Sequence, residues 1–371
     1  MSHISSLRLT DFRSYGALDV ALTGAPVVLY GPNGAGKTNL LEAISFLSPG
    51  RGLRRAKMED IARRYEGGVA PAWGVTANIG DVKAAIGQVP ENPRRRVVRL
   101  DGRSASGAEL GQLLSQMWLT PAQDRLFTGP ASERRKFLDR FSLVHAPGHG
   151  IASLRYDKMR AERNRLLSDG ITDVGWYEAL ERDMASQGAL IAAARAKTVT
   201  RLIDEIETRA AQKKDDVFPK ALVSLEGEAE EKCQSGVSLA DVEEFIREDL
   251  AQNRALDQRA GRTLRGVHRS ELRVVHAAKN MPAQDCSTGE QKALLLGLTL
   301  AHARAQADKK PILLLDEVAA HLDFNRRAAL IDELLALKTQ LFMTGTDKSL
   351  FEAFAGRAQV LHVKAGAILE E

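Results

Sequence analysis

The sequence predicts an α/β fold: a mixed sheet with flanking helices and an antiparallel subdomain, interrupted by a helical lobe. Three observations support this fold class. A glycine-rich segment, residues 31–38, follows a short apolar run at 27–30 and precedes a helical pattern. A second apolar run, 312–315, is bounded by a proline and ends in two carboxylates, as expected for a strand buried on both faces. Between these runs strand patterns almost vanish and helical periodicity dominates.

These patterns divide the chain into three parts. Residues 1–118 and 272–371 are expected to form the two parts of one α/β domain, and residues 119–271 the inserted helical lobe. Apolar runs and alternation predict strands at 4–9, 27–30, 73–79, 82–89, 96–100, 312–315, 340–344 and 359–363. Helical spacing predicts helices near 37–46, 108–117, 155–167, 176–209, 241–256 and 292–307.

Composition excludes several classes of protein. The 371 residues are 44% hydrophobic and 27% charged, unlike collagen-like, mostly disordered or disulfide-scaffold chains. The net charge of +4 permits a nucleic-acid partner, and the basic excess lies in residues 1–118. Cys233 and Cys286 lack the spacing of zinc ligands. No apolar run approaches the ~18 residues of a membrane span, and no signal region is evident, so we expect a cytoplasmic protein without a membrane partner.

The glycine-rich segment matches the pattern GxxxxGK[ST]. Its glycines let backbone N–H groups curl around phosphate oxygens, and the following helix directs its positive end at them. We expect Lys37 to reach the β- and γ-phosphates and Thr38 to ligate Mg²⁺. The predicted ATP-binding residues are Gly31, Pro32, Asn33, Gly34, Ala35, Gly36, Lys37, Thr38 and Asn39. A glycine-rich turn without a ligand is the weaker alternative, because both flanks fit.

Asp316 and Glu317, which end the second apolar run, supply what a nucleotide hydrolase needs beside this loop. Asp316 is expected to hold the Mg²⁺ shell and Glu317 to orient the attacking water. The predicted catalytic residues are therefore Lys37, Asp316 and Glu317.

A third motif, Ser287-Thr-Gly-Glu-Gln291, opens a strong helical pattern. Ser287 and Glu290 have the spacing of a capping box, which is the simpler interpretation. The alternative is that Ser287 and the N–H of Gly289 face a phosphate at this helix N-terminus. The order of the three motifs, with Asp323 seven residues after Asp316, favours the second interpretation.

This order resembles the ATP-binding-cassette (ABC) ATPases, and the helical insertion resembles their SMC/Rad50-related branch. The resemblance implies an ABC-type P-loop ATPase head interrupted by a helical lobe. Blocks spread along nearly the whole chain are similar to the RecF family of bacterial recombination proteins: 7–15, 129–139, 163–167, 266–272, 287–291 and 344–347.

The resemblance to the RecF family carries functional expectations. It implies ATP and Mg²⁺ as cofactors, an ATP-dependent homodimer and slow ATP hydrolysis that DNA stimulates. It also implies three kinds of partner in repair and the SOS response: duplex DNA next to single-strand gaps, RecO and RecR, and indirectly RecA. Each nucleotide would meet Ser287, Gly289, Glu290 and Gln291 of the second subunit, with Asp323 along the interface.

Other assignments follow from the resemblance less directly. Thr346 is the candidate γ-phosphate sensor, because no switch histidine occurs near Thr344, and Gln123 is the candidate glutamine for metal contact. Arg13 either approaches the nucleotide or pairs with an acid. The pairs 134–135 and 268–269 are expected to link lobe and head.

The candidate DNA-contacting residues are basic side chains of the first α/β segment. The alternative interpretation is a solvated surface, which is common for runs of charge. The candidates are Arg94, Arg95, Arg96, Arg99, Arg103, Arg54, Arg55 and Lys57.

Two other functions remain open from the sequence. The ATPase subunit of a membrane transporter shares the order of motifs, but it lacks such an insertion and has a different signature. A scaffold that binds ATP without hydrolysing it would use the same residues.

Overall fold

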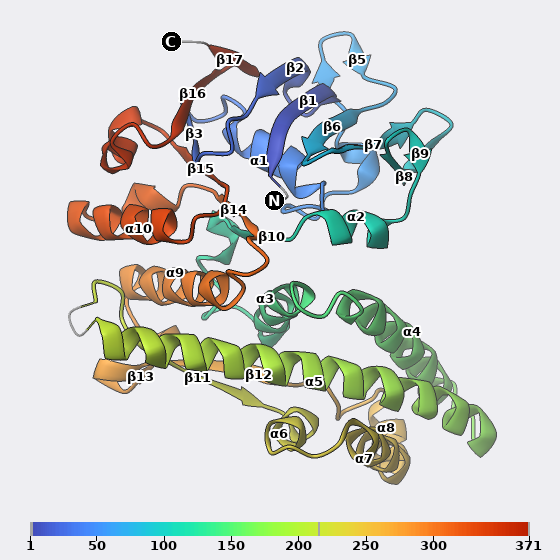
Figure 1. The fold of residues 1–371 in the computed structure, drawn as a ribbon. Coiled ribbons are helices and arrows are strands. Elements are labelled where there is room, and N and C mark those ends of the chain that lie inside the picture. The colour runs from blue at the N-terminus through green and yellow to red at the C-terminus, as the bar shows by residue number, and fades with distance from the viewer. Residues whose placement is uncertain (1–2, 214–215, 370–371) are drawn as a thin grey trace. The chain divides into compact units, whose positions relative to one another are not determined.

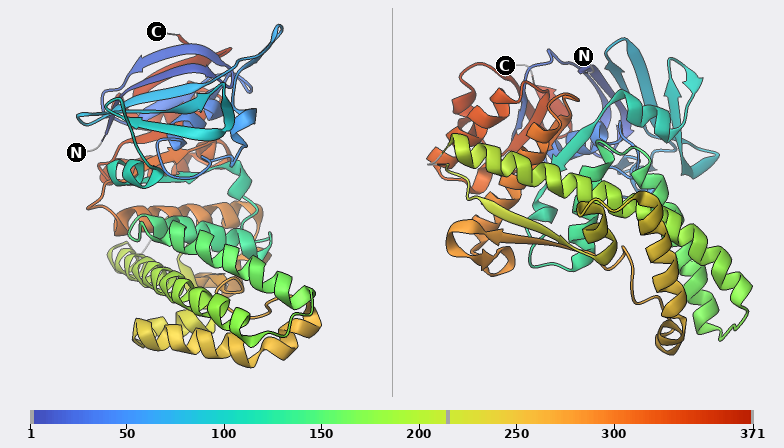
Figure 2. Two further views of the ribbon diagram at one scale, coloured as in Figure 1. Left: turned by 90° about the vertical axis from the view of Figure 1, so that its right-hand side faces the viewer. Right: turned by 60° about the horizontal axis from the view of Figure 1, so that its bottom comes forward.

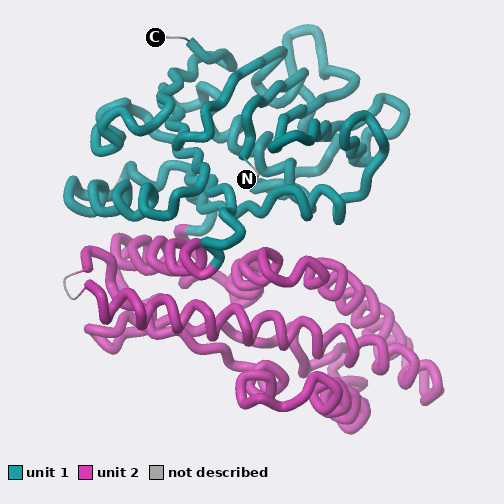
Figure 3. Tube along the Cα trace, in the orientation of Figure 1, with its two compact units in different colours: residues 1–123, 306–371 teal, residues 124–305 magenta. Residues whose placement is uncertain are grey.

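The computed structural model describes residues 3–213 and 216–369 (Figure 1). Its contacts divide the chain into two compact units, which Figure 3 draws in different colours. The first unit combines Met1–Gln123 with Gln306–Glu371, and the second is Asp124–Ala305.

An antiparallel sheet of six strands fills one side of the first unit. Its order is β2-β1-β6-β7-β8-β9. The strands predicted at 4–9, 73–79, 82–89 and 96–100 are confirmed within it, and β2 is an addition. The bounds are β1 Ile4–Phe12, β2 Tyr15–Ala21, β6 Gly74–Ile79, β7 Val82–Val89, β8 Asn92–Leu100 and β9 Arg103–Ser104.

A second six-stranded sheet, in the order β10-β14-β15-β3-β16-β17, is parallel except for its last pair. The strand β15 lies between β3, which leads into the glycine-rich loop, and β14, which ends at Leu315, directly before Asp316. The bounds are β3 Val27–Tyr30, β10 Gln116–Leu119, β14 Ile312–Leu315, β15 Leu341–Gly345, β16 Gln359–Lys364 and β17 Ala367–Leu369.

The helix predicted at 108–117 is wrong in its second half. Helix α2 spans Gly107–Leu113, where a capping box of Ser106 and Glu109 opens it. The chain then forms β10, which pairs in parallel with β14. A strand of four residues gives little periodicity of its own, so its identity depends on this distant partner.

Helix α1, Lys37–Ser45, packs between the two sheets of the first unit. Its buried apolar residues join one core with strands of both sheets. At its end Phe46 packs against Trp73, with ring centres 5.3 Å apart, and both contact Phe12. From the other sheet, Gln116 Nε2 donates to the Ile44 carbonyl at 2.9 Å. This packing fixes the start of α1, and with it the glycine-rich loop.

The first unit also contains short elements and one further helix on its C-terminal segment. These are η1 Met58–Asp60, β4 Arg64–Tyr65, β5 Gly68–Val69, η2 Pro121–Gln123, η5 Val318–His321, α10 Phe324–Ala336 and η6 Lys348–Phe354.

The second unit is mainly helical, and α4 and α5 pack side by side in it (Figure 2). It also has a three-stranded sheet, β11-β12-β13, which the sequence did not predict. No helix among the described residues is long and apolar enough to cross a bilayer. The bounds are α3 Ala131–Leu143, α4 His149–Ser168, α5 Val174–Gln212, β11 Ala221–Glu226, α6 Glu228–Gln234, α7 Leu239–Gln252, α8 Arg254–Ala260, β12 Glu271–His276, η3 Ala277–Lys279, β13 Met281–Pro282, η4 Ala283–Asp285 and α9 Thr288–Ala305.

The second unit extends further along the chain than the lobe predicted at 119–271. Strand β12 pairs with β11, and α9 packs on α5, so residues to Ala305 belong to it by contact. Residues 119–123 belong to the first unit, because Leu119 ends β10.

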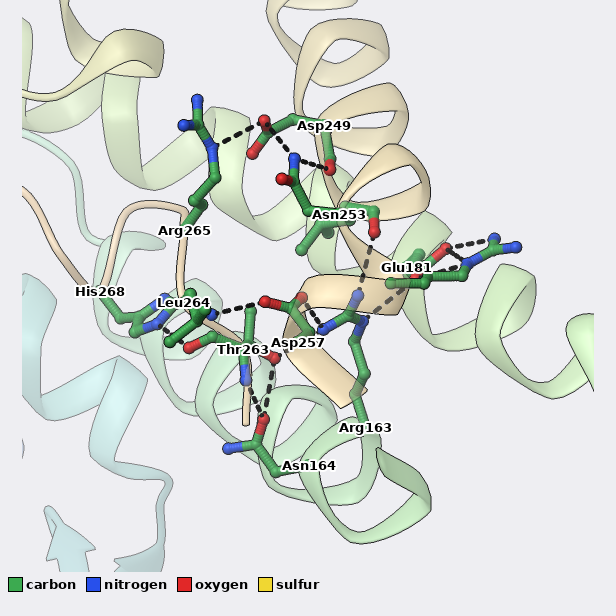
Figure 4. Close-up of polar contacts among 12 residues, drawn as sticks. Arg163, Asn164, Glu181, Asp249, Asn253, Asp257, Thr263, Leu264, Arg265 and His268 are labelled. Carbon is green, nitrogen blue, oxygen red and sulfur yellow. Dashed lines mark hydrogen bonds and ion pairs between the residues drawn. The ribbon is translucent and has the colours of Figure 1, made fainter. Parts of the chain in front are cut away.

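A buried ion network joins α4, α5 and α8 in the second unit (Figure 4). The fully buried Arg163 donates to Glu181 at 3.0 Å and to Asp257 at 2.6 Å. It also donates to the Leu250 carbonyl and the Thr263 hydroxyl. A buried charge is tolerated only when its hydrogen-bonding capacity is used in this way.

Replacing Arg163 with Met should therefore lower the free energy of unfolding by about 3–5 kcal/mol, because the carboxylate of Asp257 stays buried without its cation. Arg265→Met is the control: this side chain is 44% exposed and pairs with Glu228 and Asp249, so the loss should stay below about 1 kcal/mol. Urea unfolding followed by circular dichroism measures both, and equal losses would contradict the proposed difference.

Candidate nucleotide-binding site

The glycine-rich loop between β3 and α1 requires glycine at two positions. Gly31 has φ 147°, and a Cβ there would lie 2.1 Å from the Val363 carbonyl oxygen. Gly36 has φ 115°, and a Cβ there would lie 2.9 Å from the Tyr15 hydroxyl. Gly34, at φ 79°, has no atom within 4 Å of an added Cβ. The loop is therefore braced on one side and open at Gly34, as a phosphate cradle must be.

Tyr15 supports this loop from β2, a role that sequence reasoning missed. Its hydroxyl donates to the Gly36 carbonyl at 3.0 Å, and burial raises its pKa. The neighbouring Ser14 hydroxyl accepts from the Asn39 side-chain amide at 2.9 Å. The sequence signal was only that both residues lie in the first block similar to the RecF family.

Lys37 lies folded over the mouth of the loop. Its ammonium donates to the carbonyls of Gly31 at 2.6 Å and Pro32 at 2.9 Å, and the side chain is buried. Burial lowers its pKa, while the charges of Glu317 and Asp316 act in the opposite direction. The arrangement holds a cation where the predicted phosphates would lie.

Asp316 is the meeting point of three elements. Its Oδ1 accepts from the Thr38 hydroxyl at 2.9 Å and from the Thr344 hydroxyl at 2.7 Å. The Thr38 hydroxyl and the Asp316 carboxylate are hard oxygen ligands of the kind Mg²⁺ takes together with substrate phosphates. No cluster of three or more His, Cys, Asp or Glu suited to a metal occurs among the described residues. The donor set thus fits a magnesium ion that enters with a nucleotide.

Glu317 follows in a constrained backbone conformation. Its φ is 54°, in the left-handed region that a residue with a side chain rarely adopts. Its N–H donates to the Thr344 hydroxyl at 2.9 Å, which holds this conformation in place. Such strain is typical of functional sites, where it directs a side chain.

Thr344, rather than Thr346, contacts the acidic pair. Thr344 is buried at the end of β15, and Thr346 is exposed just beyond it. The role of Thr346 as a sensor stays a prediction. The hydroxyl of Thr344 uses both its donor and its acceptor capacity at the site, which the sequence analysis did not foresee.

Gln123 and Asp323 are both engaged in local contacts. The Gln123 side-chain oxygen accepts from the Thr120 N–H at 2.9 Å, and its Nε2 is buried without a partner. The Leu119 carbonyl accepts from the Asp316 N–H, so the loop that carries Gln123 begins beside Asp316. Asp323 caps α10 by accepting from the Arg326 N–H at 2.8 Å. Their predicted roles toward metal and interface stay predictions.

Arg13 pairs with an acid, one of the two alternatives left open by the sequence. It forms two hydrogen bonds, of 2.9 and 2.7 Å, with the fully buried Glu42 of α1. Arg54 reaches the same carboxylate at 3.2 Å and the Asn39 side chain at 2.7 Å. Arg54 thus supports the helix after the loop.

Arg96 is not placed as a DNA-contacting residue. Its guanidinium donates to the carbonyls of Phe46, Ser48 and Gly50 around the end of α1, and burial lowers its pKa to about 10. The reason is strand alternation: Arg96, Val98 and Leu100 share the inward face of β8.

The other basic candidates lie on the surface. Arg94 pairs with Glu59 at 3.1 Å and Arg103 with Glu109 at 2.7 Å. Exposed side chains without an ion partner among the described residues are Arg95, Arg99 and Lys57, and Arg55 is exposed at φ 54°.

The third motif, Ser287-Thr-Gly-Glu-Gln291, which we call the signature motif, opens α9 in the second unit with a complete capping box. The Ser287 hydroxyl donates to Glu290 Oε2 at 2.8 Å and accepts from the Glu290 N–H at 3.4 Å. Gln291 is buried and donates to the carbonyls of Gln284 and Cys286, which fixes the preceding turn. Ser287 and Gly289 are exposed at the helix N-terminus.

The two basic pairs expected to link lobe and head bond within the second unit. Arg134 pairs with Glu271 at 2.6 Å, and Arg135 donates to the Ser270 carbonyl at 2.9 Å. His268 bonds Tyr156 at 3.0 Å, and burial lowers its pKa to about 3. These contacts stabilise the lobe itself.

Replacing Thr344 with Val should weaken Mg²⁺-dependent ATP binding by about tenfold, because Asp316 loses a donor and the Glu317 N–H loses its acceptor. Titration of a fluorescent ATP analogue, with and without Mg²⁺, measures this effect. Thr346→Val is the matched control, and an equal effect there would contradict a role particular to Thr344.

Comparisons with known proteins agree with this geometry. Residues 3–368 match the family model described as the RecF/RecN/SMC N terminal domain. The "DNA replication and repair protein RecF" of Mesorhizobium japonicum is 51% identical, over 99% of this chain and 97% of that protein. The protein of that name in Brucella suis is 50% identical, over 98% and 95%.

A solved structure of the recombination mediator protein RecF with ATP, in the RecFOR pathway, has the same fold. Its TM-score is 0.81 at 23% identity, over 100% of this chain and 99% of that chain. Sequence similarity at this level along nearly the whole of both chains, together with a family match from residue 3 to 368, places the chain in the RecF family.

Proposed function

We propose that this chain is an ATP-dependent DNA-binding protein of recombinational repair, a slow ATPase stimulated by DNA. The observation that carries the ATPase proposal is that the hydroxyls of Thr38 and Thr344 both donate to Asp316, beside the glycine-rich loop to which the Lys37 ammonium bonds. The names of the relatives support the role in DNA replication and repair. They do not favour the transporter-subunit alternative.

The geometry of the site suggests a separate role in ATP hydrolysis for each of its residues. Bound Mg²⁺ would neutralise charge that develops between the β- and γ-phosphates. Lys37 would exchange its carbonyl acceptors for phosphate oxygens, and Thr38 and Asp316 would hold the metal. Glu317, directed by its left-handed backbone, would accept a proton from the attacking water.

We further propose that ATP binding joins two copies of the chain. The first unit supplies the loop and the acidic residues, and a second copy would present Ser287 and Gly289 to the γ-phosphate. Support comes from the exposure of both residues at the N-terminus of α9, where backbone N–H groups and the helix dipole favour an anion. Hydrolysis would then remove the γ-phosphate and release the dimer.

DNA and the other partners complete the proposal. Duplex DNA beside a single-strand gap would lie on the outer face of the antiparallel sheet. There Arg99 lies opposite Ala85, which lies opposite Thr76, so small side chains surround an exposed cation. RecO and RecR as partners are supported by the pathway named for the RecF–ATP structure, and indirect loading of RecA is part of the same proposal.

Glu317→Gln should bind ATP as the parent does but accumulate as a dimer, because closure persists without hydrolysis. Light scattering with saturating ATP and Mg²⁺ should give twice 40.5 kDa. The control is Glu317→Gln/Lys37→Ala, which lacks the phosphate contact and should stay monomeric. A monomeric Glu317→Gln protein that demonstrably binds ATP would refute the proposal.

Removing two exposed arginines, in Arg95→Ala/Arg99→Ala, should weaken duplex binding. The slope of log affinity against log salt should fall by up to about 1.8, since each lost phosphate contact removes about 0.9. Arg247→Ala/Arg273→Ala is the control, because these arginines are 48% and 54% exposed in the second unit. Equal weakening in both double variants would show a general charge effect and refute this surface.

A further inference from the structure

Beside the signature motif lies a lysine that the sequence analysis did not single out. Lys279 ends η3, in the connection between β12 and β13. The next residue, Asn280, has φ 47° and closes the turn in a left-handed conformation. Seven residues separate Lys279 from Ser287 along the chain, and the buried Gln291 fixes the intervening turn through the carbonyls of Gln284 and Cys286.

Lys279, Glu290 and Ser287 form one chain of hydrogen bonds. The Lys279 ammonium donates to Glu290 Oε1. Glu290 Oε2 accepts from the Ser287 N–H at 3.0 Å and from the Ser287 hydroxyl at 2.8 Å. The Lys279 hydrogen bond, followed by those from Ser287, lowers the pKa of Glu290 to about 2, so this carboxylate is charged at neutral pH.

A charged carboxylate at this place opposes the binding of a phosphate in two ways. It repels an anion that approaches the N-terminus of α9. It also occupies the single proton of the Ser287 hydroxyl, which must be donated to a phosphate oxygen instead. A signature motif that contains Glu290 therefore requires a device that offsets this charge.

We propose that Lys279 is a positioning residue that lets the signature motif accept the γ-phosphate of a nucleotide held by a second copy of the chain. Lys279 neutralises Glu290 and retains it when the Ser287 hydroxyl turns to the phosphate. This inference rests on the proposed function, because it concerns the same dimer contact. It adds a residue outside the signature motif and explains how an acidic signature binds an anion.

Lys279→Met in the Glu317→Gln background tests the proposal. The parent for these variants is the Glu317→Gln protein. The monomer of the Lys279→Met variant should bind ATP as this parent does, since Lys279 lies outside the loop that holds the nucleotide in the same chain. The protein concentration for half-dimerisation with ATP and Mg²⁺, from light scattering, should rise by at least about tenfold. Lys136→Met is the matched control: Lys136 is 47% exposed and pairs with Glu133, and Lys279 is 49% exposed.

A second substitution separates charge neutralisation from a role in the fold. Adding Glu290→Gln to Lys279→Met removes the uncompensated charge, so the half-dimerisation concentration should fall again from that of Lys279→Met alone. Lys279→Arg, which keeps the cation, should dimerise like the parent. A lysine that only stabilised the fold would give a lower melting temperature that Glu290→Gln does not restore.

The remaining outcomes overturn the inference. Unchanged dimerisation of Lys279→Met, or no recovery on adding Glu290→Gln, would refute the role of Lys279 while the parent still dimerises. If the parent and the Lys136→Met control also stay monomeric with ATP bound, the proposed function fails and the inference falls with it.

Discussion

One carboxylate oxygen, Asp316 Oδ1, organises the candidate nucleotide site. It accepts hydrogen bonds from Thr38 at the start of α1 and from Thr344 at the end of β15. The strand of the glycine-rich loop, β3, and the acidic strand, β14, are not neighbours, because β15 lies between them. Thr344 spans this distance and also holds the Glu317 backbone. The position of Asp316, the proposed metal ligand, and the direction of Glu317, the proposed general base, thus depend on the same hydroxyl.

The helix that starts at Lys37 is held in place by packing and by charge. Its apolar residues bury against both sheets, while Glu42 lies fully buried among them. An unpaired carboxylate there would cost several kcal/mol, so Arg13 and Arg54 are required as partners. Arg96 closes the far end of the helix through three carbonyls. Much of the basic excess near the loop therefore stabilises the site itself.

The sequence predicted the local parts of this structure well. The loop was predictable because glycines at 31 and 36 meet a backbone requirement that is local. The inward position of Arg96 was also within reach, since alternation puts it on the same face as Val98 and Leu100.

Features that depend on distant contacts were not predictable. Strand β10 exists because β14 pairs with it, and the second unit reaches Ala305 because α9 packs on α5. Nothing in the local pattern distinguishes Thr344 from Thr346. The two differ because β15 ends at Gly345: Thr344 lies within the strand and is buried, and Thr346 lies beyond it and is exposed.

The two helix N-termini proposed to meet phosphate share a physical constraint. Each carries a carboxylate within its first two turns, Glu42 in α1 and Glu290 in α9. The negative charge of a carboxylate there opposes an anionic ligand. In both cases a cation from another element neutralises it: Arg13 for Glu42, and Lys279 for Glu290. The difference is burial, because Glu42 is fully buried, whereas the Lys279 pair is partly exposed. The pair in α1 therefore acts as fixed support, whereas the pair in α9 is proposed to retain Glu290 while the Ser287 hydroxyl turns to the phosphate.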